Sequence, residues 1–93
     1  MAESTSRELP SASFSSFVIS LAQSALVHMG ESPDPSTGDR TTQLVLARHS
    51  IDVLGVLEEK TKGNLDEEEQ KLLASVLYEL RSKFVEVSRR QQG

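Results

Sequence analysis

The stretch FSSFVISLAQSALVHM, residues 14–29, decides the fold class of this chain. Its apolar residues recur at steps of three and four, a spacing that is typical of a helix rather than of a strand. Ser13 comes directly before the stretch and Gly30 directly after it. Because serine commonly caps the start of a helix and glycine its end, the pattern predicts a helix from Ser13 to Met29.

This predicted helix has no charged side, although surface helices usually carry one. No Asp, Glu, Lys or Arg occurs between Leu9 and Gly30. Ser16, Ser20 and Ser24 stand at four-residue spacing, so their small side chains form a stripe that another helix can approach closely. The serines also make the segment too polar for a membrane span, which needs about 20 mostly apolar residues. We therefore expect a central or interface helix and no membrane span.

A second helix is predicted over residues 42–62. The segment before it, residues 31–41, contains two prolines and cannot continue the first helix. Either Asp39 or Thr41 can cap the helix that follows. Apolar residues cover most of its circumference, and Gly55 inside it costs about 1 kcal/mol relative to alanine unless close packing offsets that cost.

A third helix is predicted after a short turn. Gly63 stands just beyond the second helix, where glycine typically adopts a left-handed cap. Asp66, followed three residues later by Glu69, matches a capping box and places acid in the first turn. We expect this helix to run to about Val87 with a single apolar stripe. Because the turn is short, the second and third helices should form an antiparallel hairpin.

These segments predict an all-α fold, a small three-helix domain over residues 13–87. A mobile N-terminal tail (1–12) and a C-terminal tail (88–93) flank it. At 93 residues the chain fits one domain, near the size at which one core can only just hold a fold together. Aromatic residues are only 4% of the chain, so Leu, Val, Ile and Ala must build the core. We expect dimerisation to complete the fold.

Several blocks of sequence in a fixed order carry a resemblance to a known family. The blocks are Phe14-x-x-Phe17-x-x-Ser-Leu-Ala, Ala25-Leu-Val-His28-x-Gly30, Pro33-x-Pro35, Ile51-Asp52-x-Leu54, Lys60-Thr-Lys-Gly-Asn-Leu65 and Leu77-Tyr-Glu-Leu-Arg81-x-x-Phe-Val. In this order they resemble the bacterial family named domain of unknown function 1844, over residues 14–87. The resemblance implies a small, mostly helical, cytoplasmic domain. It carries no activity, substrate or catalytic residue.

The composition argues against several functional classes. The chain holds no cysteine, which removes disulfide frameworks, thiolate metal sites and cysteine nucleophiles and fits a reducing compartment. Residues 1–10 lack the basic-then-apolar order of a secretory signal, so we expect a cytoplasmic protein. No Gly-x-Ser-x-Gly motif occurs, and the helix after Gly63 begins with acids that would repel phosphate. We expect no catalytic function and no cofactor.

Two alternative functions remain open, and the first is a metal-dependent enzyme built in a helical bundle. His49 and Asp52 stand three residues apart, so a helix places two potential ligands on one face. Metal centres in bundles assemble their ligands from several helices, so a symmetric dimer would have to bring two copies together. An ordinary surface or interface contact is the simpler interpretation. We therefore assign no metal site.

The second alternative is a small nucleic-acid-binding regulator that uses the basic C-terminal end. That end contains Arg81, Lys83, Arg89 and Arg90. The formal net charge of −4 argues against this function, because basic domains usually supply the phosphate neutralisation on which non-specific affinity depends. Cations near the C-terminus of a helix also stabilise its dipole without any ligand. Nucleic acid is therefore not the partner that we expect.

Self-association follows from counting the apolar faces of the predicted helices. A three-helix bundle buries about one stripe of each helix, whereas the first two helices each show at least two. We predict a homodimer through the first helix and part of the second, in a non-catalytic interaction or regulatory module that also engages an unidentified protein. Alternatively, the N-terminal tail or the long connection covers these faces within one subunit. The candidates for the interface or its adjoining core are Phe17, Ile19, Leu21, Leu26, Val45 and Val56.

Overall fold

The computed structural model describes residues 12–92, and this part of the chain contains three helices and no strand. The helices are α2 (Phe14–Met29), α3 (Leu44–Lys60) and α4 (Glu67–Gln92). Each helix contacts the other two. The prediction of an all-α fold is confirmed. Apart from Ala12, the N-terminal tail predicted from the sequence lies outside the described residues.

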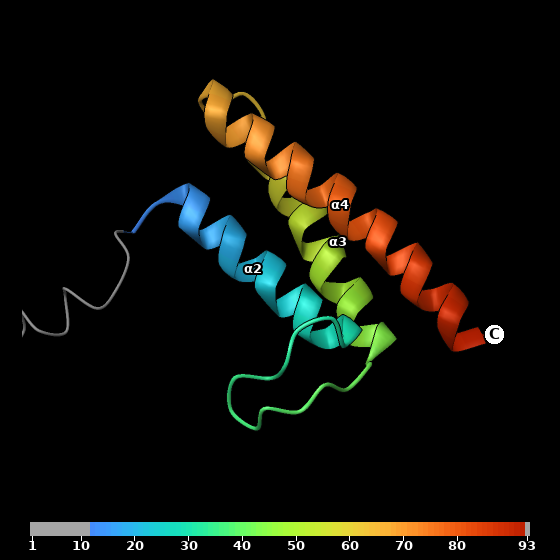
Figure 1. The fold of residues 1–93 in the computed structure, drawn as a ribbon. Helices are drawn as coiled ribbons and strands as arrows, with labels where there is room; N and C mark the ends of the chain where they lie inside the picture. Colours follow the sequence, from blue (N-terminus) through green and yellow to red (C-terminus); the bar gives the residue numbers. More distant parts are fainter. Residues whose placement is uncertain (1–11, 93) are drawn as a thin grey trace, which may run out of the picture.

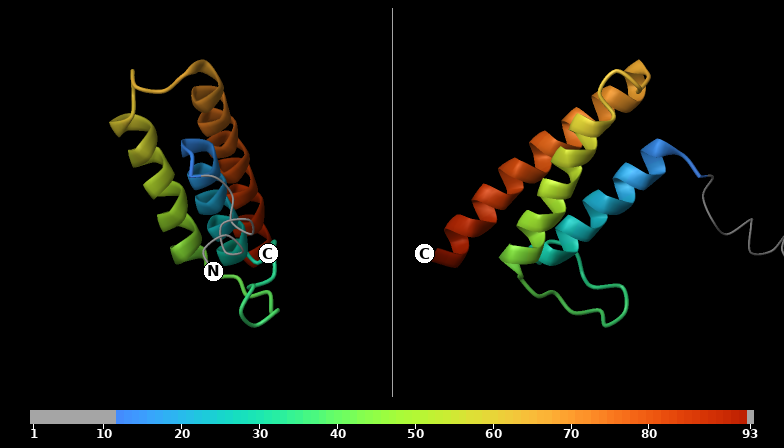
Figure 2. Two further views of the ribbon diagram at one scale, coloured as in Figure 1. Left: turned by 90° about the vertical axis from the view of Figure 1, so that its left-hand side faces the viewer. Right: turned by 180° about the vertical axis from the view of Figure 1, so that it is seen from behind.

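The two connections lie at opposite ends of the bundle. Figure 1 shows the α3–α4 turn at one end and the longer α2–α3 connection at the other, where α4 also ends. The left view in Figure 2 shows α2 lying in front of the space between α3 and α4. The helix that lacks charge therefore packs across both of the others, as a central helix should.

The predicted capping of α2 is confirmed at both ends. The Ser16 N–H donates to Ser13 Oγ at 3.1 Å, and the Ser13 N–H donates to Ser16 Oγ at 3.3 Å. Gly30 follows Met29 with φ of +80°, and its N–H donates to the Leu26 and Val27 carbonyls. Within residues 12–92 no helix has both the length and the hydropathy that crossing a membrane requires.

The predicted start of α3 was wrong. The helix begins at Leu44, and neither Asp39 nor Thr41 caps it. The N-cap residue is Gln43, whose side chain makes no capping hydrogen bond. Its backbone N–H donates instead to the His28 carbonyl of α2, at 2.6 Å. A contact with the end of α2 therefore sets the start of α3, which local capping rules could not indicate.

The end of α3 differs from the prediction by two residues. The helix ends at Lys60, and Thr61 is the C-cap with φ of −100°. The Thr61 hydroxyl donates to the Leu57 carbonyl at 2.8 Å. Gly63 has the left-handed φ of +83° that the sequence suggested, but it lies in the turn and not at the helix end. The backbone N–H and the hydroxyl of Thr61 therefore both donate to the Leu57 carbonyl where the helix ends.

The start of α4 agrees with the prediction and its end does not. The Asp66 N–H donates to Glu69 Oε1 at 3.0 Å, and the Glu69 N–H donates to Asp66 Oδ1 at 2.8 Å, which confirms the capping box. The helix passes Val87 and continues to Gln92, so residues 88–92, which we predicted as part of a C-terminal tail, are helical. Val87 is only 2% exposed, and beyond it Arg90 forms an ion pair with a residue 59 positions away.

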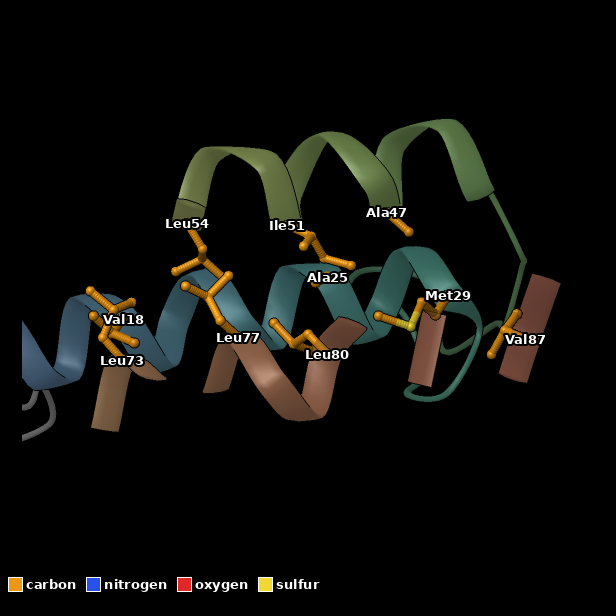
Figure 3. Close-up of a cluster of buried hydrophobic side chains, with 10 residues drawn as sticks. All are labelled: Val18, Ala25, Met29, Ala47, Ile51, Leu54, Leu73, Leu77, Leu80 and Val87. Atoms are coloured by element: carbon orange, nitrogen blue, oxygen red, sulfur yellow. The ribbon is translucent and has the colours of Figure 1, made fainter. Parts of the chain in front are cut away.

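One hydrophobic core lies where the three helices meet. Figure 3 shows its side chains converging from all three helices. No polar or charged residue is buried among the described residues, and the core is aliphatic apart from one methionine. Leu, Val, Ile and Ala therefore supply most of it, as the scarcity of aromatic residues implied. Its members are Val18, Ala25, Met29, Ala47, Ile51, Leu54, Leu73, Leu77, Leu80 and Val87.

Candidate functional site

The exposed large apolar side chains are concentrated on α3. Four of the eight belong to this helix, and they are the most extensive departure from a polar surface in the described part of the chain. We call Val45, Leu46, His49, Val53 and Val56 the outer face of α3. All five are exposed, from 37% for Val53 to 83% for Val45.

Helical geometry explains why this face points away from the core. At 3.6 residues per turn, Ala47, Ile51 and Leu54 share one side of α3, and all three are buried against the other helices. The outer-face residues stand at intervening positions, on the side that neither α2 nor α4 covers. The helix is therefore apolar on two sides and has partners in the described structure for only one.

The six predicted interface residues fall into two groups. Phe17, Ile19, Val45 and Val56 are exposed, whereas Leu21 and Leu26 are partly buried and pack against the core. Phe17 and Ile19 are two residues apart, so they project about 160° apart around α2. They therefore lie on opposite flanks of the helix. The candidates do not form one continuous surface.

A shallow apolar groove lies on the Ile19 flank, between α2 and α4. Its volume is about 350 Å³. The residues that line it are Ala22, Leu26, Ser75, Val76, Glu79, Leu80 and Lys83. Ile19 precedes Ala22 by three residues and Leu26 by seven, which puts it on the same side of α2. Ile19 and Leu26 were among the predicted interface residues, whereas the α4 residues of this groove were not predicted as part of a surface.

His49 and Asp52 lie about one turn apart on the exposed side of α3. The Asp52 carboxylate lies 3.9 Å from the Arg48 guanidinium, and both side chains are well exposed. Among the described residues there is no group of three or more histidine and acidic side chains that could hold a metal ion. In one subunit His49 and Asp52 are both exposed, and Asp52 faces the Arg48 cation.

Two of the four basic residues near the C-terminus are bound within the chain. Arg90 Nη2 lies 2.8 Å from Glu31 Oε2, and Lys83 Nζ lies 3.6 Å from Glu31 Oε1 and 3.7 Å from Glu86 Oε1. The hydrogen bond from Arg90, followed by the charges of Arg90 and Lys83, holds the pKa of Glu31 below its ordinary value. These cations therefore attach the end of α4 to the α2–α3 connection.

A hollow beside the α2–α3 connection brings together a serine, a histidine and an aspartate. It measures about 350 Å³ and is lined by Ser20, Gln23, Ser24, Val27, His28, Asp34 and Pro35. Asp34 Oδ1 accepts bonds from the Ser36 hydroxyl and N–H, at 2.6 and 2.8 Å, and these bonds lower the pKa of Asp34. No hydrogen bond joins Ser24, His28 and Asp34 to one another within residues 12–92. The hollow lacks the connected hydrogen bonds that activate a nucleophile.

Comparison with known proteins identifies one family. A family model described as "Domain of unknown function (DUF1844)" matches residues 11–86, which include all of α2 and α3 and most of α4. No curated protein matches the chain, and no solved structure does. The match confirms the resemblance seen in the ordered sequence blocks. With three helices, one aliphatic core and those blocks in order, this chain belongs to the family of domain of unknown function DUF1844.

Proposed function

We propose that this chain is a non-catalytic protein-interaction or regulatory module that self-associates as a homodimer through α2 and part of α3. In this proposal α3 and α4 act as an antiparallel hairpin that supports the interface. The short connection over residues 61–66 and the contact between the two helices support that arrangement. The absence of cysteine from the sequence favours a cytoplasmic location. An unidentified protein is the further partner of the dimer.

The observation that carries this proposal is the exposed outer face of α3, together with Phe17 of α2. Each of the four aliphatic residues and the phenylalanine keeps a large share of its side chain in water. Ser20 and Ser24 lie on the same side of α2 as Phe17, and both are exposed. Their small side chains allow another helix to approach. No charged residue interrupts α2 from Phe14 to Met29.

The expected gain in free energy is sufficient for a dimer of modest affinity. Full burial of one such side chain contributes about 1.5–3 kcal/mol, so covering the exposed half of five in each of two copies contributes on the order of 10 kcal/mol. Association costs roughly 4–15 kcal/mol in lost translational and rotational freedom. Near the lower end of that cost the net gain is about 6 kcal/mol, which corresponds to a dissociation constant on the order of tens of micromolar.

Sedimentation velocity over a concentration series tests the proposal with a matched pair of variants. Val56 on α3 is 56% exposed, and Ser82 on α4 is exposed as well. We expect Val56→Glu to shift the protein to monomer, because a buried carboxylate without a partner is costly. Ser82→Glu introduces the same change in charge on the side of α4 that faces away from the core, and it should leave the dimer intact. Circular dichroism on both variants checks that the helices are retained.

Two results would contradict the proposal. One is a compact, cooperatively melting monomer of the unmodified protein at high micromolar concentration. The other is an equal loss of mass in both variants, since charge alone would then explain the effect. Because both positions are exposed, neither variant should fail to fold.

A further inference from the structure

We infer that α3 packs against α3 of a second copy in antiparallel orientation, across a two-fold axis near the middle of the helix. This inference rests on the proposed self-association and specifies its geometry. It makes the outer face of α3 the centre of the dimer, with Phe17 of α2 at its edge.

The first step is the spacing of the outer face. Leu46, His49, Val53 and Val56 follow one another at steps of three, four and three, which is the seam that two packed helices share. The seam contains no acid, lysine or arginine, and all four residues are exposed. Lys60, one step further, ends the seam at the end of the helix. A partner helix can therefore lie along almost the whole length of α3.

The second step is the charge beside the seam, which sets the orientation. Arg48 lies near the start of α3 and Glu59 near its end. The two stand eleven positions apart, about three turns of helix, so they project within roughly 20° of each other, on one side of the seam. In an antiparallel pair, positions on the same side face each other, and Arg48 of one copy comes level with Glu59 of the other.

The unpaired state of Glu59 in one subunit strengthens this step. No ion pair engages its carboxylate among the residues that the structure describes, and its side chain is exposed. A parallel pair would instead put the two Arg48 side chains on opposite flanks of the seam, far along the helix from either Glu59, and would align the two helix dipoles unfavourably. Asp52 lies nearest to the proposed axis, and its charge is already opposed by Arg48 of its own chain at 3.9 Å.

The third step is the identity of the partner. A helix with a basic start, an acidic end and an uncharged seam between them is complementary to its own reversed copy. Each contact in a two-fold dimer occurs twice, so a weak pair such as Arg48 and Glu59 contributes double. The charges opposite to Arg48 and Glu59 are supplied by the second copy, so no protein of different sequence is needed. A second copy of this chain is therefore the occupant that the surface itself specifies.

Cysteine cross-linking tests the orientation, and the chain has no natural cysteine to interfere. A disulfide needs Cα atoms within about 7 Å of each other. In an antiparallel pair with its axis near residue 52, Val53→Cys should cross-link to itself on mild oxidation. Val45→Cys alone should not, because its two copies lie roughly 20 Å apart along the helix. A mixture of Val45→Cys and Lys60→Cys should cross-link again. Ser82→Cys, on the side of α4 that faces away from the core, measures the background.

Charge reversal provides an independent check of the same orientation. Arg48→Glu and Glu59→Arg should each weaken the dimer about three- to tenfold in sedimentation equilibrium, as expected for an exposed pair that occurs twice. The double variant restores both pairs and should recover the original dissociation constant. If both single variants weaken the dimer but the double variant does not recover the original dissociation constant, the inference is overturned.

The outcomes separate this inference from the proposed function. Self-cross-linking of Val45→Cys as efficient as that of Val53→Cys would indicate a parallel pair and overturn the inference. A dimer seen by sedimentation in which no α3 cysteine cross-links more than the Ser82→Cys background would overturn it as well, while leaving self-association in place. A protein that sediments as a monomer at all concentrations would overturn both.

Discussion

The two faces of α3 carry the same kinds of side chain in opposite surroundings. Ala47, Ile51 and Leu54 are buried against α2 and α4, whereas the valines and the leucine of the outer face remain exposed. Helical periodicity alone cannot tell the two faces apart, because each is a set of aliphatic residues at steps of three and four. The difference shows that α2 and α4 together cover only one side of α3 in a single subunit. The other side, the outer face of α3, is the apolar surface that remains available to a binding partner.

The largest expected effect is a difference in the free energy of unfolding between variants on the buried and the outer face of α3. Leu54 is fully buried at the centre of the core, so Leu54→Ala should reduce the free energy of unfolding by about 2–5 kcal/mol through lost burial and a residual cavity. Urea denaturation at a concentration where the protein is monomeric measures it. Val56→Ala, on the outer face, should change the stability of the monomer by less than about 0.5 kcal/mol. Equal losses would show that something within the subunit also covers the outer face.

A substitution at Gly55, which lies between the two faces, should have an effect of intermediate size that stabilises the fold. A methyl group added there would lie 3.4 Å from the end of the flexible Arg81 side chain, which is ordinary contact, and φ is not in the left-handed range. Gly55→Ala should therefore raise the free energy of unfolding by about 0.5–1 kcal/mol. Differential scanning calorimetry should show a higher melting temperature.

Gly30→Ala is the matched control for that substitution. Gly30 has φ of +80°, and a Cβ there would come within 2.7 Å of Thr42 Oγ1. This variant should melt at a lower temperature than the unmodified protein, because the backbone is strained and the side chain clashes. A destabilised Gly55→Ala would mean that α3 and α4 pack more closely than the contact at Gly55 indicates.

The smallest effect is expected away from both faces of α3, at the ion pairs of Glu31. The folded protein lowers the pKa of Glu31 below its ordinary value of 4.5. The carboxylate therefore stabilises the fold above the ordinary value, and this contribution is lost as the pH falls through the lowered one. Glu31→Gln should cost up to about 1 kcal/mol at pH 7, because these pairs remain open to solvent.

Urea titrations of the protein and of Glu31→Gln at several pH values test this dependence. Below the lowered pKa of Glu31 both side chains are neutral, so the difference in stability should disappear there. Glu86→Gln is the control, since within residues 12–92 the Glu86 carboxylate has one ion pair, with Lys83 at 3.7 Å, and its substitution should cost less. A difference that persists unchanged in acid would assign the effect of Glu31 to packing instead of charge.

The parts of the fold that could be predicted from the sequence are those governed by neighbouring residues. The cap of α2 at Ser13, its end at Gly30 and the capping box of Asp66 and Glu69 were all confirmed, because each depends on hydrogen bonds within a few residues. Two boundaries were wrong for the opposite reason. The start of α3 depends on the His28 carbonyl, and α4 past Val87 is held through Glu31 and Arg90, which lie far apart in the sequence.

The candidate site divides in the same way. The excess of apolar faces was visible in the sequence, and it named Phe17, Ile19, Val45 and Val56 among the residues now found exposed. Periodicity could not show that Leu21 and Leu26 are drawn toward the core, or that Leu46 and Val53 are left outside. Which apolar stripe of a helix is covered depends on how its neighbours cross it.

The sequence by itself determined that this chain forms three helices with an aliphatic core, where two of them start, and that it has more apolar faces than one small bundle can bury. Those properties follow from periodicity and capping, which act over one or two turns of helix. Only the tertiary structure decided that α2 packs across α3 and α4, that Glu31 joins the end of α4, and that the outer face of α3 is the one left uncovered. These outcomes depend on contacts between residues remote in the chain, whose relative placement no local pattern contains.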